Sequence, residues 1–464
     1  MTDVALNLIA SFQAALGSPV PPSPVTLLGG QSLCSVFAVS DLAQASIAVA
    51  GSTLASFVTL NRNGPPPDVV VDRDLASAWF SGSIRPLGWD LLPAWDAVGG
   101  EYECRDGWIR LHTNAPRHRA AALTVLDVPE DRTAVGAAVG TWSAQELETA
   151  VIAAGGAAAA MRSVTDWQAH PQGQAVAGEP LVWTQRTSTA GRHSAALESR
   201  ERPLAGLRVL DLTRVLAGPV ATRLLAGWGA EVLRIDPPDW DEPEIVPEVT
   251  LGKRCARLDL RTSDGRRHFI ELLHSADVLV HGYRPDALDQ LGLGDEVRDS
   301  VCPGIIDVTL DAYGWTGPWQ RRRGFDSLVQ MSSGIADAGR LMTAGARPVP
   351  LPVQALDHAT GYLLAAATIT GLTQRQIDGA GSRWRTSLAR VAELLIGAAP
   401  LHVPADPSSS PAALNPTGRI ERTAWGDALR LPAPLAVQGS PLQWAFPAGR
   451  LGSDLPQWLG GDGK

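Results

Sequence analysis

Apolar and polar positions along the second half of the chain fall into blocks of two kinds. Short apolar runs typical of buried strands occur at LRVLDL (207–212), EVLRID (231–236), VLVHGY (278–283) and GIIDVTL (304–310). Between them, AGPVATRLLAGWGA (217–230) and TSDGRRHFIELLHSAD (262–277) have the spacing of helices, the latter starting at Thr262 or Ser263. Strands that alternate with helices predict a parallel α/β sheet, wound like a nucleotide-binding domain.

The first half of the chain differs in composition and in its pattern of apolar positions. Residues 1–200 are rich in Ala and Gly, and YECRDGWIRLH (102–112) alternates around an Asp-Gly pair that predicts a β-hairpin. Ser143 and Glu146 make a capping-box start to a helix. These signals predict a small α+β module, followed by a polar, Gly- and Pro-punctuated linker. Beyond about residue 400, weak periodicity predicts an extended tail that packs over other elements.

Composition narrows the classes of protein. The 464 residues are 45% hydrophobic and carry a net charge of −9, which argues against a nucleic-acid or anionic-membrane binder. We expect no membrane span, because no window holds 18 uninterrupted apolar residues, and the N-terminus does not have the pattern of a signal peptide. Four widely spaced cysteines support neither a zinc site nor a disulfide framework. We therefore expect a cytoplasmic protein without a bound metal.

Several catalytic signatures are absent. A dinucleotide dehydrogenase would place GxGxxG after the first strand, but TRVLAGPVAT has one Gly followed by Pro219, although Asp236 ends the second strand as that class requires. GxSxG, HExxH and GxxxxGK[ST] do not occur. His358 adjoins Asp357, but neighbouring residues rarely point the same way on a helix, which favours a structural or orienting role for His358.

Three segments remain as candidates for chemistry. LGKRCARLDLRTSDGRR (251–267) and QRRRGFDSLVQMSSG (320–334) concentrate basic residues in an acidic protein, and arginine forks suit phosphates. Each cluster taken alone is also compatible with a solvated face. VQALDHATGYLLAAA (353–367) places Asp357 ahead of small apolar residues, a pattern that by itself favours a helix cap worth about 1 kcal/mol.

The order of these pieces resembles the family III CoA-transferases, the CaiB/BaiF family. LAGLRVLDLTRVLAGPVATRLLAGWGAEVLRID, GKRCARLDL, ADVLVHGYRPDALDQLGLG, GIIDVTLDAYGWTGPWQRRRGFDSLVQMSSG and ALDHATGYLLAAATITGL follow one another in the family's order, nearly continuously over residues 203–395. The resemblance implies an α/β fold, with a parallel Rossmann-like sheet domain and a smaller α+β domain. The resemblance also implies that Asp357 is the catalytic nucleophile.

The resemblance further implies the CoA contacts. They come from the loop after the first strand, the basic segment before LDL, the HGYRP turn and the GFD turn. The implied residues are Leu216, Ala217, Lys253, Arg254, Gly282, Tyr283, Arg284, Arg323, Phe325 and Asp326. Small residues such as Ala359 and Gly361 would let acyl-CoA approach the backbone, and Phe325, Leu328 and Met331 would allow a hydrophobic acyl chain.

The implied reaction moves CoA from an acyl-CoA to a carboxylic acid through an aspartyl mixed anhydride and an aspartyl-CoA thioester. Acyl-CoA and a small carboxylic acid are the expected partners. Coenzyme A takes part as a portion of the substrate, with no separate cofactor. Family members are interlocked dimers, in which the small domain of one subunit closes over the site of the other, so a homodimer is expected.

The first half carries family features in an unusual place. VSDLAQASIAVAGSTL (39–54) resembles a second Asp block, with Asp41 in the position of Asp357, and residues 102–172 resemble the family's small domain. We interpret the chain as a rearranged or partly duplicated member and Asp41 as a relic. This order leaves open whether the interlocking contacts form between two chains or within one.

This reading divides the chain into five parts. They are a partial large-domain-like segment (1–100), a small α+β domain (101–186), a linker (187–202), a Rossmann-like CoA-binding catalytic domain (203–400) and the tail (401–464).

Two alternatives stay open. The related 2-methylacyl-CoA racemases use a His in the GFD block as acid and base, and the residue here is Phe325, which cannot take a proton. A non-catalytic CoA-binding homologue is the second alternative.

Overall fold

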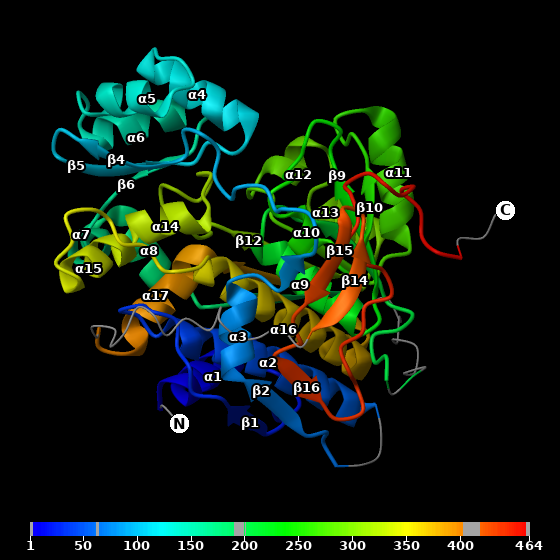
Figure 1. Cartoon of the computed structure of the whole chain (residues 1–464). Helices are drawn as coiled ribbons and strands as arrows, with labels where there is room; N and C mark the ends of the chain where they lie inside the picture. The colour runs from blue at the N-terminus through cyan, green and yellow to red at the C-terminus, as the bar shows by residue number, and fades with distance from the viewer. Residues whose placement is uncertain (1–2, 62–64, 190–198, 200, 402–417, 461–464) are drawn as a thin grey trace.

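The second half of the chain forms a seven-stranded sheet in the order β10-β9-β8-β11-β12-β13-β7 (Figure 1). The computed structural model describes residues 3–61, 65–189, 199, 201–401 and 418–460. Six of the strands are parallel: β8 (Arg208–Leu212), β9 (Glu231–Asp236), β10 (Arg254–Arg257), β11 (Val278–His281), β12 (Ile306–Asp311) and β13 (Ala380–Ser387). Taken in chain order they have the 3-2-1-4-5-6 arrangement of a Rossmann fold. The predicted Rossmann-like sheet is confirmed.

Helices pack on this sheet because its strands are buried along most of their length. The helices of this half are α9 (Ala217–Gly227), α10 (Val246–Val249), α11 (Ser263–His274), α12 (Ala287–Gln290), α13 (Asp295–Val301), α14 (Asp326–Ser332), α15 (Ile335–Met342), α16 (Ala355–Asp378) and α17 (Leu388–Ala398). Thr262 caps α11 by accepting a hydrogen bond from the Gly265 amide, so the first of the two predicted starts is the one used.

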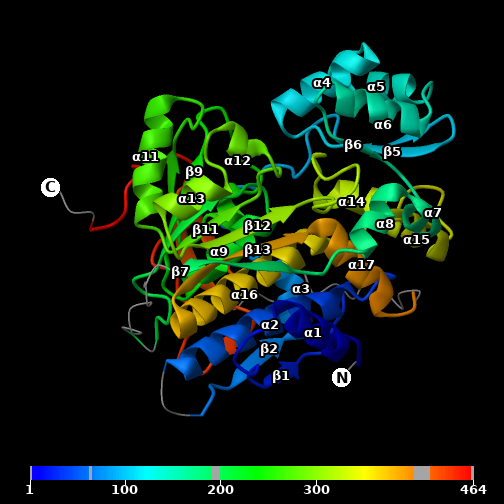
Figure 2. The same ribbon diagram turned by 180° about the vertical axis from the view of Figure 1, so that it is seen from behind.

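The small domain has its own sheet and core. Strands β4 (Gly100–Cys104) and β5 (Gly107–Leu111) form the predicted hairpin, and β6 (Ala158–Ala160) pairs with β5. Helices α4 (Pro116–Leu126), α5 (Arg132–Val139) and α6 (Ala144–Ala153) cover the sheet, and the Ser143 hydroxyl caps α6. In Figures 1 and 2 this domain stands beside the carboxyl-end side of the large sheet.

The chain returns from the small domain through two short helices, α7 (Val164–Ala169) and α8 (Pro171–Ala177). Strand β7 (Trp183–Thr189) then pairs antiparallel with β13 and completes the large sheet. The segment proposed to begin the linker is therefore partly a strand, and residues 190–198 and 200 lie outside the described part of the chain.

The N-terminal segment adds a second, smaller α/β layer. It consists of α1 (Asp3–Leu16), β1 (Val25–Leu28), α2 (Val39–Leu60), β2 (Val69–Asp72) and α3 (Arg73–Phe80), and α2 runs beside α16 in both views (Figures 1 and 2). Helix α2 is long and apolar enough to cross a membrane, but 94% of its most apolar window is buried inside the protein. Its apolar character is accounted for by packing in the core.

The C-terminal segment contains three strands that the sequence pattern did not predict. Strands β14 (Arg419–Thr423) and β15 (Gly426–Arg430) form a sheet with β3 (Ile84–Pro86), and β16 (Leu435–Val437) pairs with β2. These strands are short, and two of their partners lie more than 300 residues earlier in the chain, so local periodicity could not reveal them.

Candidate active site

A pocket of about 480 Å³ opens at the carboxyl ends of β8, β11 and β12. The strand order reverses between β8 and β11, and ligands of open α/β sheets bind at such a point. Seven of the predicted site residues line this one pocket: Ala217, Gly282, Tyr283, Arg284, Arg323, Phe325 and Asp357. Blocks more than 100 residues apart in the sequence are therefore brought together.

Asp357 lies in the first turn of α16, as the third residue of that helix. Its side chain is buried, and among the described residues no group donates a hydrogen bond to its carboxylate or forms an ion pair with it. Burial raises the pKa of Asp357 well above the ordinary carboxyl value, and the nearby Asp326 raises it further. Asp357 does not cap its helix, so a cap does not account for the carboxylate.

Asp326 performs the capping that Asp357 does not. Its Oδ2 accepts a hydrogen bond from the Asp357 backbone N–H at 2.9 Å, and Gln330 donates to its Oδ1. Burial raises the pKa of Asp326 to about 6, and the backbone N–H donors partly oppose this shift. Asp326 thus fixes the start of α16 and the position of Asp357, although it does not itself line the pocket.

Four arginines line the pocket without a carboxylate partner among the described residues: Arg117, Arg214, Arg284 and Arg323. Arg214 donates to the Tyr283 hydroxyl at 3.1 Å, and Arg323 donates to a backbone carbonyl. Burial and the neighbouring arginines lower the pKa values of Arg117 and Arg323. Mutual repulsion of this kind is relieved by a bound polyanion, and guanidinium groups suit phosphates.

The sequence did not single out Arg117 or Arg214. Arg214 could have been found, because it lies two residues after the first strand of the sheet, where Rossmann folds bind phosphates. Arg117 could not, because it comes from α4 of the small domain, and only the tertiary fold brings it to the pocket.

Two predicted CoA contacts have other partners. The Lys253 ammonium is buried 2.9 Å from Asp211, between strands of the sheet. Arg254 lies near Glu231 and Asp454 and donates to carbonyls of the C-terminal segment. The structure therefore places both cations outside the pocket, where they hold the sheet and the tail together.

Other predicted residues lie near the pocket but do not line it. Leu216 is buried at the N-cap position of α9, next to Ala217. A Cβ on Gly361 would come within 2.4 Å of the Ala217 carbonyl, so this glycine lets α16 approach α9 and does not face acyl-CoA. Leu328 and Met331 pack in a separate apolar cluster beneath the small domain, so of the three apolar residues only Phe325 lines the pocket.

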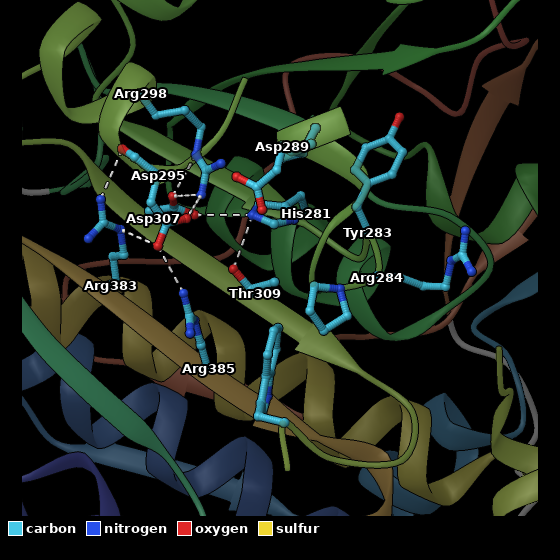
Figure 3. A pocket seen from close by; sticks show the side chains of 13 residues that line it. His281, Tyr283, Arg284, Asp289, Asp295, Arg298, Asp307, Thr309, Arg383 and Arg385 are labelled. Carbon is cyan, nitrogen blue, oxygen red and sulfur yellow. Dashed lines mark hydrogen bonds and ion pairs between the residues drawn. The ribbon is translucent and has the colours of Figure 1, made fainter. Parts of the chain in front are cut away.

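A polar network lies behind the HGYRP turn (Figure 3). Asp307 accepts from Arg298 at 2.7 Å, and His281 lies between Asp307 and Thr309. The cavity beside it is about 20 Å³, which holds about one water. Since its charges are paired with each other, this network supports the turn and leaves Arg284 free to face the larger pocket.

Asp41 provides an internal comparison with Asp357. Each is the third residue of a long buried helix, α2 or α16. Arg73 donates to both oxygens of Asp41 at 2.9 Å, and the pair is buried. Of these two aspartates, Asp357 lines the pocket, whereas Asp41 is held in its ion pair with Arg73.

Comparison with known proteins places this site in a class. Residues 204–423 match the model of CoA-transferase family III. An acyl-CoA transferase of Fusarium pseudograminearum is 32% identical over 223 residues (42% of this chain, 48% of that protein). A succinyl-CoA:glutarate CoA-transferase of Mus musculus is 35% identical over 222 residues (45% and 49%). A crystal structure of Rv3272 from Mycobacterium tuberculosis is 32% identical, covers 42% of this chain and 55% of that chain, and has a TM-score of 0.39.

The matched segment contains every residue that lines the pocket except Arg117 and His118 of the small domain, and it includes Arg284, Arg323 and Asp357. Residues 204–423 therefore belong to CoA-transferase family III, as the order of the sequence blocks predicted. The chain spans about half the length of the curated relatives it matches.

We predict opposite effects on stability when the two aspartates are changed. Asp357→Asn removes a buried carboxylate that has no partner, so the free energy of unfolding should rise at neutral pH. Because the folded-state pKa of Asp357 is raised, the gain should vanish as the pH falls to the ordinary carboxyl range. Asp41→Asn leaves Arg73 buried and unpaired, and should cost about 3–5 kcal/mol.

Urea unfolding of both variants beside the wild type, at pH 7.5 and at acidic pH, measures these effects. A loss of stability in Asp357→Asn equal to that in Asp41→Asn would contradict the contrast between an open and a paired carboxylate.

Proposed function

We propose that the chain transfers CoA from an acyl-CoA donor to a carboxylic acid acceptor, with Asp357 as the nucleophile. The observation that carries the proposal is a buried, unpaired carboxylate in a pocket whose walls hold four arginines without acidic partners. CoA is an elongated polyanion with one reactive end. We expect the phosphates of an acyl-CoA to contact the arginines and its thioester to lie at Asp357. The family of residues 204–423 and the names of the relatives support CoA transfer as the reaction class.

The reaction conserves the energy of the thioester. The Asp357 carboxylate attacks the acyl carbonyl, and collapse of the adduct breaks the C–S bond to give a mixed anhydride and CoA thiolate. The thiolate attacks the Asp357 carbonyl and releases the donor acid, which leaves an aspartyl-CoA thioester. The acceptor carboxylate then attacks this thioester to form a second anhydride. The thiolate finally takes the new acyl group and frees Asp357.

The environment of Asp357 makes the ionised carboxylate a stronger nucleophile, although its raised pKa means that less of it is ionised at a given pH. A carboxylate without hydrogen bonds is more basic than an exposed one, and hence a better nucleophile once it is ionised. Burial also keeps water away from the anhydride.

The first amides of α16 are not free to stabilise an oxyanion. Asp326 accepts from the Asp357 N–H, and the His358 N–H donates to the Gln354 carbonyl. The pocket-lining turn Gly324–Phe325 leaves its two backbone N–H groups without a partner among the described residues. We assign the oxyanion contacts to this turn.

Three apolar residues, Ala312, Phe325 and Leu388, line the pocket together with Asp357 and Asp311. A hydrophobic acyl group fits these walls, and the donor and acceptor acids are to be found by screening a panel. A cytoplasmic, reducing compartment is also proposed, because all four cysteines are free thiols and three of them are buried.

We predict a covalent adduct on Asp357. Incubation with acyl-CoA and then hydroxylamine or borohydride should modify the peptide that contains Asp357, as read by mass spectrometry. Asp357→Asn should lose on the order of 10³-fold or more in kcat and form no adduct. Asp41→Asn, assayed below its unfolding temperature, should keep its activity because its carboxylate is outside the pocket.

Exchange of an α-proton in deuterated water without any acceptor acid would instead indicate racemase chemistry. CoA binding with neither reaction would indicate a non-catalytic homologue.

We also predict a defined pH dependence. Asp357 must be ionised to attack, and its pKa is raised, so kcat/KM for acyl-CoA should fall on the acid side at a pH above the ordinary carboxyl range. Asp326→Asn keeps an oxygen acceptor for the backbone but removes the neighbouring charge. The fall of kcat/KM on the acid side should therefore occur at a lower pH in this variant than in the wild type.

Asp337→Asn is the matched control, since Asp337 is a buried aspartate of the neighbouring helix that is paired with Arg340 outside the pocket. An acid-side fall of kcat/KM that shifts equally in both variants, or in neither, would contradict the role of Asp326.

A further inference from the structure

The sheets of the two halves of the chain have the same strand arrangement at one edge. In the second half β12 pairs parallel with β13, and β7 closes the edge in the antiparallel sense. In the first half β1 pairs parallel with β2, and β16 closes the edge in the antiparallel sense. The helix before the last parallel strand is α2 in one half and α16 in the other, and each carries an aspartate at its third position. The halves are therefore related internally.

The closing strands are exchanged between the halves. Strand β7 comes from the first half of the chain but completes the sheet of the second half, whereas β16 comes from the C-terminal end but completes the sheet of the first half. The edge strand of each sheet is therefore supplied by the other half of the chain (Figures 1 and 2). The two halves of one chain thus interlock by exchanging their closing strands.

The small domain, which belongs to the first half, is held against the second half at the pocket. Glu148 on α6 pairs with Arg322 at 2.8 Å, and His112 stacks on Phe325 with ring centroids 3.6 Å apart. These contacts place the N-terminal end of α4 at the mouth of the pocket.

Helix α4 brings two side chains to the pocket. Arg117 lies with its guanidinium carbon 6.0 Å from the centre of the Trp240 ring and has no carboxylate partner among the described residues. His118 is 1% exposed and meets Phe325 edge-on, and neither of its ring nitrogens has a hydrogen-bond partner within the described residues. An arginine and a histidine left without partners beside other arginines indicate that the ligand itself supplies their contacts.

The equivalent position in the first half is closed. Arg73 begins α3 directly after β2, and Leu388 begins α17 directly after β13. Leu388 lines the pocket beside Asp357, whereas Arg73 fills the corresponding place and holds Asp41. Arg73 also donates to the carbonyl of Gln31 and the hydroxyl of Ser32, which draws that loop over Asp41. Of the two aspartate positions, the one at Asp357 is therefore open and the one at Asp41 is closed in the described part of the chain.

We propose that this site is completed in cis: Arg117 and His118 of the first half contact the CoA moiety held by the second half of the same chain, and a second copy is not required. The identity of the ligand rests on the proposed function. The homodimer expected from the sequence stays a prediction, and the test below decides between it and the single-chain site.

The first part of the test measures the affinity for free CoA by titration calorimetry, which needs no turnover. Arg117→Glu should weaken binding by about tenfold or more, since it replaces a charge-assisted phosphate contact by repulsion. Arg105→Glu is the matched control and should leave the affinity unchanged, because Arg105 is an exposed arginine of the same domain that contacts Glu146 and the Thr141 carbonyl outside the pocket. Wild-type affinity in Arg117→Glu would overturn the proposal.

The second part distinguishes cis from trans completion. Arg117→Glu and Arg284→Glu chains are co-expressed with different tags, and tight CoA sites are counted. Completion in cis leaves no site of wild-type affinity and gives single-tagged monomers of 48.9 kDa by light scattering. Exchange of small domains between chains would regenerate a wild-type pocket in about a quarter of the sites, and this result would also overturn the proposal. Tight CoA binding without any transfer would reject only the proposed function.

Discussion

The arrangement of this protein depends on the buried carboxylate of Asp357, which has no hydrogen-bond or ion-pair partner among the described residues. Burying an ionised carboxyl group costs free energy unless hydrogen bonds or a cation compensate it. The fold supplies this compensation to Asp41, through Arg73, and withholds it from Asp357. Asp326 adds a like charge nearby while it holds the backbone of Asp357 in place. The cost in stability is the physical basis for assigning the reactive position to Asp357.

The surrounding structure can hold such a group because it is rigid at that point. Helix α16 is buried along nearly its whole length between α2 and α9, and Gly361 permits the close approach to α9. Behind the HGYRP turn, paired charges on β11, β12 and β13 fix the strands that precede the loops of Arg284 and Arg323. The four arginines and Asp357, which have no ion-pair partner among the described residues, then face one cavity.

The sequence was informative where the signal is local or follows a fixed order of blocks. The alternation of strands and helices gave the Rossmann-like sheet, and the register of five blocks brought Asp357, Arg284 and Phe325 to one pocket. It was not informative for charge partners. Lys253 and Arg254 look like phosphate ligands in the sequence, but Asp211 and the C-terminal segment neutralise them, and these partners are up to about 200 residues away. Arg117 and the strands of the tail were missed for the same reason, because their neighbours are set only by the tertiary fold.

The central claim, that Asp357 exchanges its own oxygen with the substrates, can be read from the protein during turnover with an acceptor acid labelled with oxygen-18 in its carboxylate. If the acceptor attacks the aspartyl thioester, one labelled oxygen bridges the second anhydride and remains on Asp357 when the thiolate leaves with the new acyl group. Mass spectrometry should then find oxygen-18 in the peptide that contains Asp357 and none in the peptide that contains Asp41. Transfer of CoA with all of the label in the acyl-CoA product and the free acid, and none in the protein, would contradict the account.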